Sequence, residues 1–262
     1  GFVPRLVQGR SVAVTPVALR KDASYLVTGG TGGVGLLIAR EMARQGAGHL
    51  VLLSRSGLPD RRLWPTLPEG GEAYRQMAAV REIEAFGTSV TAPMVDVTDL
   101  AAMEGLSGML AALPPLRGVV HAAAHIGAGR VPELTLDDVS RMLRPKVTGT
   151  WVLERVTAAY ELDFFVAFSS TAGVFGATDL AHYAAANVFV DAFAQARRAA
   201  GRPVVSISWG TWEKIRGSDE QQRLIDRGGL KIMPAARTLN AFTQLRGAKA
   251  AHLVFAEIDW RT

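Results

Sequence analysis

The fold is decided by one stretch of the chain, Thr28-Gly29-Gly30-Thr31-Gly32-Gly33-Val34-Gly35. It follows a short run of β-forming residues and leads into a segment with helical periodicity. Gly30, Gly32 and Gly35 have the spacing G-x-G-x-x-G, which permits a tight turn and lets backbone N–H groups approach a phosphate closely. The N-terminus of the following helix would then face that phosphate. The stretch therefore predicts a dinucleotide-binding loop, with a purely structural glycine turn as the alternative.

Beyond this loop, apolar runs that suit strands alternate with segments of helical periodicity, interrupted by a Pro/Gly-rich insertion at 57–71. This alternation is typical of a parallel sheet with helices on both faces. The sequence thus predicts the α/β class, as a Rossmann-type doubly wound parallel sheet of about seven strands. The expected strands are residues 25–28, 50–54, 90–95, 118–122, 164–169, 204–208 and 252–255, and the expected helices are residues 34–45, 72–86, 100–113, 136–160, 181–200, 220–227 and 235–245.

Length and composition limit the possible classes of protein. A chain of 262 residues fits one large α/β domain, or one domain plus a fragment, and 48% hydrophobic residues allow a sizeable core. No apolar run approaches the roughly 20 residues that span a bilayer, and no signal peptide is recognisable, so no membrane association is expected. Because the chain has no cysteine, disulfides and thiolate metal sites are excluded, which suits the cytoplasm. We expect no metal site.

The net charge is 29 − 24 = +5, and it is distributed unevenly. Residues 1–62 carry nine Lys and Arg against three Asp and Glu. Such a bias can attract anions, either a phosphorylated cofactor or an acidic carrier protein, although it can also be ordinary surface charge. The basic residues are scattered, without a basic helix or an interleaved aromatic platform, so nucleic acid is not an expected partner.

The end of the second expected strand indicates which nucleotide binds. An NAD enzyme usually has an acidic residue there, but this chain has Arg55, whose guanidinium suits the 2′-phosphate of NADP. An exposed loop arginine is the alternative interpretation. Asp96-Val97 ends the third strand and could contact the adenine edge, and Ala122-Ala123 ends the fourth strand and would pass close to the cofactor.

Two polar residues follow in a spacing that favours catalysis. Ser170 ends the strand 164–169, at the carboxyl edge where ligands bind in such sheets. Tyr183 lies thirteen residues later, early in the next helix, and Asn187 shares its helix face because it is four residues further on. Each residue alone is more often structural, but their joint spacing downstream of a nucleotide loop is uncommon.

With these motifs the chain resembles the ketoreductase domain of a modular type I polyketide synthase, within the short-chain dehydrogenase/reductase superfamily. The resemblance covers about residues 24–262, the expected catalytic subdomain. Residues 1–23 resemble a linker and the remnant of a structural subdomain, most of which lies outside this chain. The matching positions are 28–35, 54–57, 121–123, 146, 168–173, 183–187 and 208–210.

The resemblance implies the roles of the site residues. Ordinary superfamily members carry lysine at the position of Asn187, and this family exchanges the two types, which assigns the cation to Lys146 rather than leaving it a surface lysine. Tyr183 would donate a proton with its pKa lowered by Lys146, Ser170 would hydrogen-bond the substrate carbonyl, and Asn187 would orient Lys146 or a water. The residues expected to bind NADPH are Thr28, Gly30, Thr31, Gly32, Gly33, Val34, Gly35, Ser54, Arg55, Asp96, Val97, Ala122, Ala123, Trp209 and Gly210.

Substrate contacts are expected from three further residues. His125 could touch a phosphopantetheine arm or be a simple loop histidine. Trp212 could close on the nicotinamide or the acyl chain, with packing as the alternative. Phe175 stands eight residues before Tyr183, where one stereochemical type of the family has tryptophan, and this favours an L-hydroxy product.

Two neighbouring segments bear on the same site. The Leu-Asp-Asp signature of the other stereochemical type is absent directly after residues 121–123, and the Leu-Asp-Asp at 136–138 stands at a helix start, where we expect a cap. Residues 213–230 are polar and are expected to form a lid.

The implied reaction is reduction of a β-ketoacyl thioester on an acyl carrier protein, with neighbouring polyketide synthase domains as further partners. Three alternatives stay open: reduction of an α-ketoacyl thioester in a depsipeptide-forming synthetase, a catalytically silent structural module, and an added epimerase activity. Because Ser170, Tyr183, Lys146 and the loop glycines are all present, a silent module is disfavoured.

Overall fold

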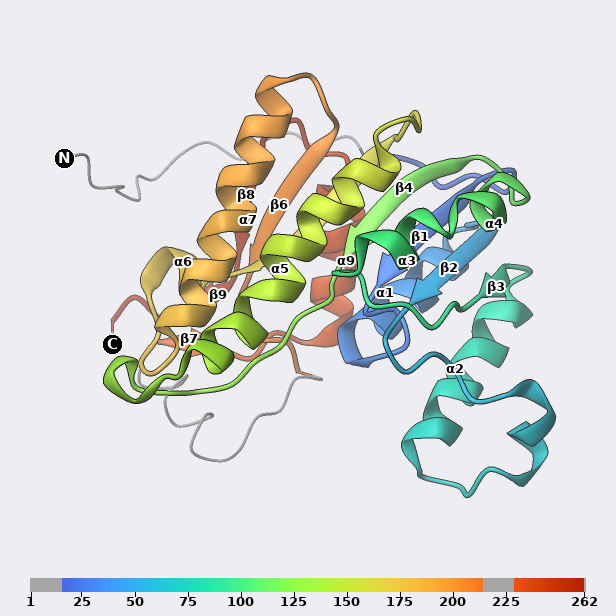
Figure 1. Cartoon of the computed structure of the whole chain (residues 1–262), viewed down its shortest axis with the longest axis horizontal. Coiled ribbons are helices and arrows are strands. Elements are labelled where there is room, and N and C mark those ends of the chain that lie inside the picture. Colours follow the sequence, from blue (N-terminus) through green and yellow to red (C-terminus); the bar gives the residue numbers. More distant parts are fainter. Residues whose placement is uncertain (1–15, 214–228, 262) are drawn as a thin grey trace.

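A central sheet of seven parallel strands organises the protein (Figure 1). The computed structural model describes residues 16–213 and 229–261. The strand order is β3-β2-β1-β4-β5-β6-β8, so the chain moves outward from β1 in both directions. This confirms the predicted doubly wound sheet. The strands are β1 (Ser24–Thr28), β2 (His49–Leu53), β3 (Ser89–Thr91), β4 (Leu116–His121), β5 (Phe164–Ser170), β6 (Val204–Trp209) and β8 (His252–Phe255).

The order of the strands determines where a ligand can bind. Next to β1, the chain crosses to β2 on one side and, later, to β4 on the other. A crevice forms outside the carboxyl ends of the strands at such a switch point. The glycine loop leaves β1 at this end of the sheet, and Ala122 follows β4 at the same end, with its N–H donating to Thr28 O.

Two hydrophobic cores lie on opposite faces of the sheet because every central strand is buried on both sides. One core packs α1 (Gly33–Arg44), α2 (Glu72–Ala85) and α9 (Ala235–Leu245) through residues such as Ile38 and Phe242. The other packs α3 (Leu100–Glu104), α4 (Ser107–Ala111), α5 (Leu136–Thr157) and α7 (Ala181–Ala199) through residues such as Leu153 and Val190. Figure 1 shows α5 and α7 side by side on this second face.

Several predicted boundaries need correction. The third strand ends at Thr91 rather than at residue 95, and only an isolated bridge between Ser54 and Met94 continues it. The predicted helix 100–113 is broken at Gly105 into α3 and α4, because residues 105 and 106 form the turn between them. The predicted helix 220–227 and most of the predicted lid lie outside the described residues.

Several short elements were not predicted from the sequence, because a periodic pattern can be recognised only over more residues than they contain. They are the 3₁₀ turns η1 (Arg61–Thr66), within the Pro/Gly-rich insertion, and η2 (Val131–Glu133), the helix α6 (Ala172–Phe175), and an antiparallel pair of strands, β7 (Leu230–Lys231) and β9 (Glu257–Ile258).

The backbone on either side of residues 214–228 is brought together. An isolated bridge joins Trp212 to Met233, and two backbone hydrogen bonds reinforce it. Glu213 N–H donates to Met233 O at 3.1 Å, and Met233 N–H donates to Thr211 O at 2.8 Å. Residues 211–213 and Met233 are therefore held together beside the carboxyl end of β6.

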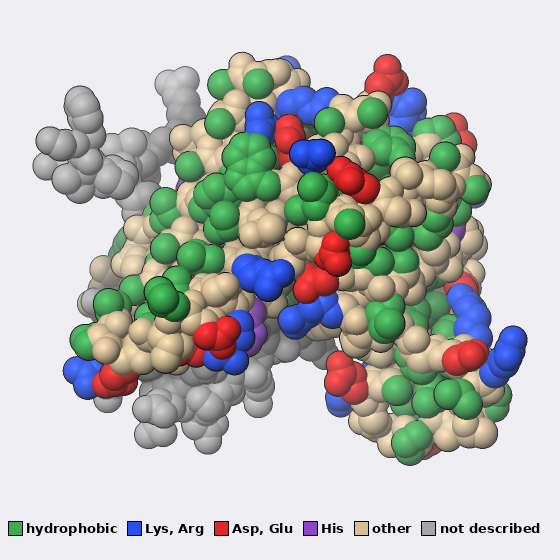
Figure 2. All heavy atoms as spheres, in the orientation of Figure 1, with side chains coloured by type: hydrophobic (Ala, Val, Ile, Leu, Met, Phe, Trp, Pro, Cys, Tyr) green, Lys and Arg blue, Asp and Glu red, His purple; other side chains and the backbone are tan. Residues whose placement is uncertain are grey.

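On the face shown in Figure 2, basic and acidic side chains are interspersed, and hydrophobic side chains gather over α7. Trp151 of α5 and Val188 of α7 are among the exposed apolar residues of these helices. In the described ranges 16–213 and 229–261, no helix has the combined length and apolar character needed to cross a bilayer.

Candidate active site

The glycine loop is held against backbone on several sides. A Cβ on Gly35 would lie 2.1 Å from Gly29 O, and a Cβ on Gly30 would lie 2.7 Å from Val27 O. Gly29 itself has φ +65°, in the left-handed region that favours glycine. Side chains at these positions would force the turn apart, so glycine is required here by the close approach of the backbone.

The N-terminus of α1 is left open for a ligand. Its N-cap is Gly32, and no side chain caps the helix. The first N–H groups of a helix have no partner within the helix, and together with the helix dipole they form an anion site. A Cβ on Gly33 would meet no heavy atom within 4 Å, so the surface beside the helix start is free.

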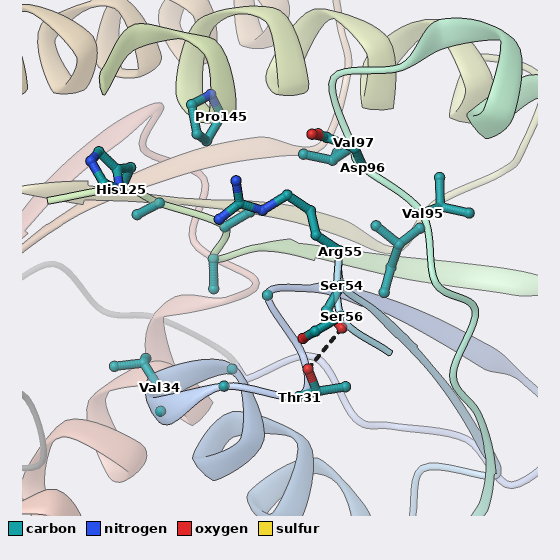
Figure 3. A pocket seen from close by; sticks show the side chains of 18 of the residues that line it. Thr31, Val34, Ser54, Arg55, Ser56, Val95, Asp96, Val97, His125 and Pro145 are labelled. Atoms are coloured by element: carbon teal, nitrogen blue, oxygen red, sulfur yellow. Dashed lines mark hydrogen bonds between the residues drawn. The ribbon is translucent and has the colours of Figure 1, made fainter. Parts of the chain in front are cut away.

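A cavity of about 820 Å³ opens in front of this helix start (Figure 3). Thr31 Oγ1 donates to Ser54 Oγ at 2.8 Å across the cavity floor, which ties the glycine loop to the end of β2. The sequence therefore located most of the cavity wall. The predicted residues that line it are Thr31, Gly32, Gly33, Val34, Gly35, Ser54, Arg55, Asp96, Val97, Ala122, Ala123 and His125.

Three guanidinium groups line the same cavity. Arg55, the predicted one, reaches across the cavity in Figure 3 and makes no hydrogen bond or ion pair with another described residue. Arg141 and Arg144 of α5 were missed, because they lie on a helix far from the loop in sequence. Arg141 is paired with Asp137 and Asp138, whereas Arg144 donates to Thr98 Oγ1 at 3.1 Å.

These features fit a nicotinamide dinucleotide. The glycine cradle and the uncapped helix start suit a pyrophosphate, and the cavity is large enough for most of such a ligand. The guanidinium of Arg55 is free to meet a further anionic group.

Some predicted cofactor residues are packed away from the cavity. Thr28 and Gly30 lie beneath the loop, and neither lines the cavity wall. Trp209 is 4% exposed and packs with Phe168 and Phe255, and a Cβ on Gly210 would lie 3.0 Å from Ala256 Cβ. A direct contact of Trp209 or Gly210 with the cofactor therefore finds no support in this structure.

Thr28 instead belongs to a hydrogen-bond chain that reaches α5. Its hydroxyl lies 2.7 Å from His121 Nδ1, and His121 Nε2 lies 3.0 Å from Pro145 O. Burial lowers the pKa of His121 to about 3, so the ring is neutral at ordinary pH. Because the Pro145 carbonyl can only accept, Nε2 carries the proton and Thr28 donates to Nδ1. The chain fixes the backbone immediately before Lys146.

Lys146 is a buried cation in the helix α5. It is 3% exposed, and its Nζ donates to Phe168 O at 2.5 Å. Of the two predicted roles of Asn187, orienting Lys146 or orienting a water, the first has no direct hydrogen bond between the two side chains in the described residues. Burial lowers the pKa of Lys146 to about 8, and the charge of Asp191 acts against this lowering. The alternative of a surface lysine is therefore excluded.

Tyr183 faces this cation from α7. Lys146 Nζ lies 6.0 Å from the centre of its ring. Burial raises the pKa of Tyr183 above its ordinary value, and hydrogen bonding to Ser170 opposes the rise only in part. The net direction is opposite to the lowering that the resemblance implied, because desolvation of the phenolate outweighs the contacts that favour it. Tyr183 is thus a protonated acid at neutral pH.

Ser170 and Asn187 complete the predicted catalytic cluster. Ser170 Oγ accepts from Ala172 N–H at 3.2 Å, and the Ser170 side chain also hydrogen-bonds Tyr183. Asn187 is fully buried, and its Nδ2 donates to Tyr183 O at 2.7 Å. Its Oδ1 is buried and has no hydrogen-bond partner among residues 16–213 and 229–261, so one acceptor of this side chain is open to a further donor.

The predicted substrate residues have different surroundings. His125 is exposed on the cavity rim, and Phe175 is 41% exposed and packs edge-on against Trp260, with ring centres 6.2 Å apart. Trp212 is 2% exposed and packs against Phe168 and Trp209. The packing alternative therefore holds for Trp212.

The Leu-Asp-Asp at 136–138 has the structural role that was expected of it. Thr135 caps α5, and its hydroxyl accepts from Asp138 N–H at 3.1 Å while Asp138 Oδ2 accepts from Thr135 N–H at 3.0 Å. The Thr135 hydroxyl also donates to Asp138 Oδ2 at 2.6 Å, and this hydrogen bond, with those from Thr135 N–H and Arg141, lowers the pKa of Asp138 to about 2. This reciprocal arrangement is a capping box.

Comparisons with known proteins agree with this geometry. The family model of the KR domain matches residues 23–214. The chain belongs to the ketoreductase domains of polyketide synthases. It is 36% identical over 240 residues to pikromycin polyketide synthase component PikAII of Streptomyces venezuelae, which covers 88% of this chain and 6% of that protein. It is 38% identical over 205 residues to 6-methylsalicylic acid synthase of Aspergillus terreus, which covers 77% of this chain and 11% of that protein.

Solved structures give the same result. The ketoreductase from the first module of phoslactomycin biosynthesis in Streptomyces sp. HK803 superposes with a TM-score of 0.82 at 34% identity, over 95% of this chain and 55% of that chain. This chain therefore spans about half of a solved ketoreductase and a small part of the synthases that it matches. Ketoreductase domains of this kind are oxidoreductases of the short-chain dehydrogenase type.

Proposed function

We propose that this domain reduces a β-ketoacyl thioester, carried on an acyl carrier protein, to the β-hydroxyacyl thioester with NADPH. One observation carries the proposal: buried Lys146 faces Tyr183, and the predicted partner Ser170 ends β5 at the carboxyl edge of the sheet that also forms the dinucleotide cavity. Membership in the ketoreductase family supports the reaction class.

The chain's own residues would bind and protonate the ketone. The bound nicotinamide would supply a hydride to the carbonyl carbon. Ser170 donates a hydrogen bond to the carbonyl oxygen and so stabilises the charge that develops there. Tyr183 gives its phenolic proton to that oxygen, so the ketone C=O becomes a CH–OH group. Lys146 stabilises the phenolate that is left.

The preference for NADPH rests on the wall of the cavity. Arg55 has no carboxylate partner among the described residues, and no acidic residue occupies the end of β2. A 2′-phosphate would satisfy the free guanidinium, whereas the 2′-hydroxyl of NADH would leave it unpaired.

The carrier and the domain context rest on the relatives. The matched proteins are multidomain synthases, so we propose that residues 1–23 are a linker and the remnant of a structural subdomain, and that neighbouring synthase domains and an acyl carrier protein are the partners. Phe175 stands where one stereochemical type of the family has tryptophan, and this supports an L-hydroxy product.

The test is a cofactor-oxidation assay with a β-ketoacyl thioester mimic. We expect turnover with NADPH, slower turnover with NADH, and a loss of about 10²–10⁴-fold for Tyr183→Phe at unchanged NADPH affinity. Chiral chromatography of the product then tests the L-hydroxy assignment. Full activity of Tyr183→Phe would exclude Tyr183 as the proton donor. Turnover of an α-ketoacyl thioester, without turnover of the β-ketoacyl thioester, would show that the proposed substrate class is wrong.

A further inference from the structure

A buried carboxylate, Asp191, lies behind the catalytic cluster and has no part in the reaction as described above. It stands four residues after Asn187 and eight after Tyr183 on α7, so the three residues share one stripe of the helix. Asp191 is 7% exposed. Because burial of a carboxylate is unfavourable without compensation, its presence beneath the site needs a physical reason.

Two strands hold this carboxylate in place. Ser206 of β6 donates to Asp191 Oδ1 at 2.5 Å, and Ser208 Oγ lies 3.4 Å from Oδ2. His252 of β8 approaches the same oxygen, with Nε2 at 3.5 Å, and lies 2.9 Å from Ser208 Oγ. Ser208 is fully buried, so this Asp, His and Ser grouping cannot reach a substrate and is not a nucleophilic triad.

The same network continues to the backbone that holds Lys146. Ser208 Oγ lies 3.2 Å from Ser169 Oγ, and Ser169 Oγ donates to Asn187 O at 3.3 Å. The residue before Ser169 is Phe168, whose carbonyl accepts the hydrogen bond from Lys146 Nζ. Asp191 is thus connected through two serines to the strand that holds the ammonium group.

Charge gives a second connection. Lys146 takes part in no ion pair of the described residues, and its single hydrogen bond goes to a neutral carbonyl. The ionisable groups that face it are Tyr183 on α7, His121 on β4, which is neutral, and Asp191. Asp191 is therefore the one anionic side chain, among those described, whose charge supports the buried cation.

We propose that Asp191 is a positioning residue that keeps Lys146 charged and fixes it behind Tyr183. This inference rests on the proposed function only in giving Lys146 a role in turnover. Without the carboxylate, Lys146 would lose its proton at a lower pH, and the site would hold a neutral amine at a pH where the wild type holds a cation.

The experiment compares Asp191→Asn, which keeps the shape and removes the charge, with the wild-type chain. We expect the alkaline limb of the pH–rate profile to move to lower pH by about one unit. Ser206→Ala, which removes the closest donor and changes little volume, should move it in the same direction by less. Asp191→Glu should restore the limb. The matched control is Glu154→Gln, which removes a partly buried carboxylate that pairs with Arg197 at 3.3 Å and should leave the limb in place.

A second measurement works without turnover. The chain has five lysines, so the side-chain nitrogen of Lys146 can be followed by NMR with isotope-labelled lysine and assigned with Lys146→Arg. We expect its titration midpoint to fall in Asp191→Asn and, by less, in Ser206→Ala. An unchanged midpoint and limb in both variants would overturn the inference and leave Asp191 a purely structural group. If the wild type does not turn over but the midpoint falls, the proposed function fails and the inference stands.

Discussion

The proposed cofactor half and the proposed catalytic half of the site differ in the groups that form them. The cofactor half is an open cavity whose wall is mainly backbone and glycine, with the start of α1 facing it. The catalytic half is a buried layer of polar side chains, in which Lys146, Asn187 and Asp191 are each less than a tenth exposed. The first half is shaped by the absence of side chains, and the second by side chains that compensate one another.

This difference predicts how each half fails. In the cofactor half, an added atom should collide with backbone and damage both the loop and the fold. In the catalytic half, loss of the Lys146 charge should impair catalysis while removing the net cost of burying that charge. Inactivating variants should therefore lower the stability of the protein when they lie in the cofactor half and raise it when they remove the Lys146 charge.

The largest effect is expected in the cofactor half. Gly35→Ala would place a Cβ 2.1 Å from Gly29 O, so we expect a loss of about 3 kcal/mol of stability and of at least about tenfold in NADPH affinity. Thermal melting and a cofactor titration measure both. The control is Gly33→Ala, whose Cβ meets no heavy atom within 4 Å and which should change stability by less than about 0.5 kcal/mol. Equal effects of the two variants would contradict the close-approach argument.

The catalytic half should give an effect of opposite sign. The pKa of Lys146 falls from 10.5 to about 8 on folding, so keeping it charged costs about 3 kcal/mol below pH 8. Lys146→Met removes this cost and one hydrogen bond worth about 1 kcal/mol, for a net gain of about 2 kcal/mol at neutral pH. Turnover should be lost.

The pH dependence sharpens this prediction. Because the folded pKa lies below the unfolded one, the burial cost is fully present below about pH 8 and disappears as the pH rises towards 10.5. The stability gain of Lys146→Met, measured by denaturant unfolding, should therefore shrink over that range. The exposed Lys231→Met is the control and should show no such trend. A variant less stable than the wild type at neutral pH would disprove the charge-burial cost.

The smallest effect is expected at the cavity wall. Arg55→Ala should weaken NADPH binding by about tenfold, or about 1.4 kcal/mol, and leave NADH binding nearly unchanged, because only NADPH carries the 2′-phosphate. Titrations with both cofactors measure the selectivity, and Arg62→Ala, outside the cavity, is the control. Equal weakening of both cofactors would place Arg55 elsewhere on the ligand.

Features that depend on local residue pattern were predicted from the sequence, and features that depend on tertiary packing were not. The glycine loop and the seven parallel strands were predicted because each depends on local residue pattern. Arg141 and Arg144 were missed because they reach the cavity only through the packing of α5 against the sheet. Trp212 was ambiguous for the same reason, since an aromatic residue after a strand suits a core as well as a binding site.

The pKa of Tyr183 shows a second limit. The family resemblance predicted a tyrosine beside a lysine, which the structure contains. It could not predict which of two opposing effects is larger, because desolvation depends on how deeply the packing buries the phenol. Asp191 escaped notice altogether, because its partners lie on β6 and β8, far along the chain.

The bridge between Trp212 and Met233 has a consequence for changes in the length of residues 214–228. Backbone hydrogen bonds between residues 211–213 and Met233 fix the distance between the described segments that flank residues 214–228. Doubling the length of a closed loop costs only about 0.6 kcal/mol in closure entropy. Replacing residues 214–228 by a stretch of twice their length between these two anchors should therefore change the free energy of unfolding by less than about 1 kcal/mol.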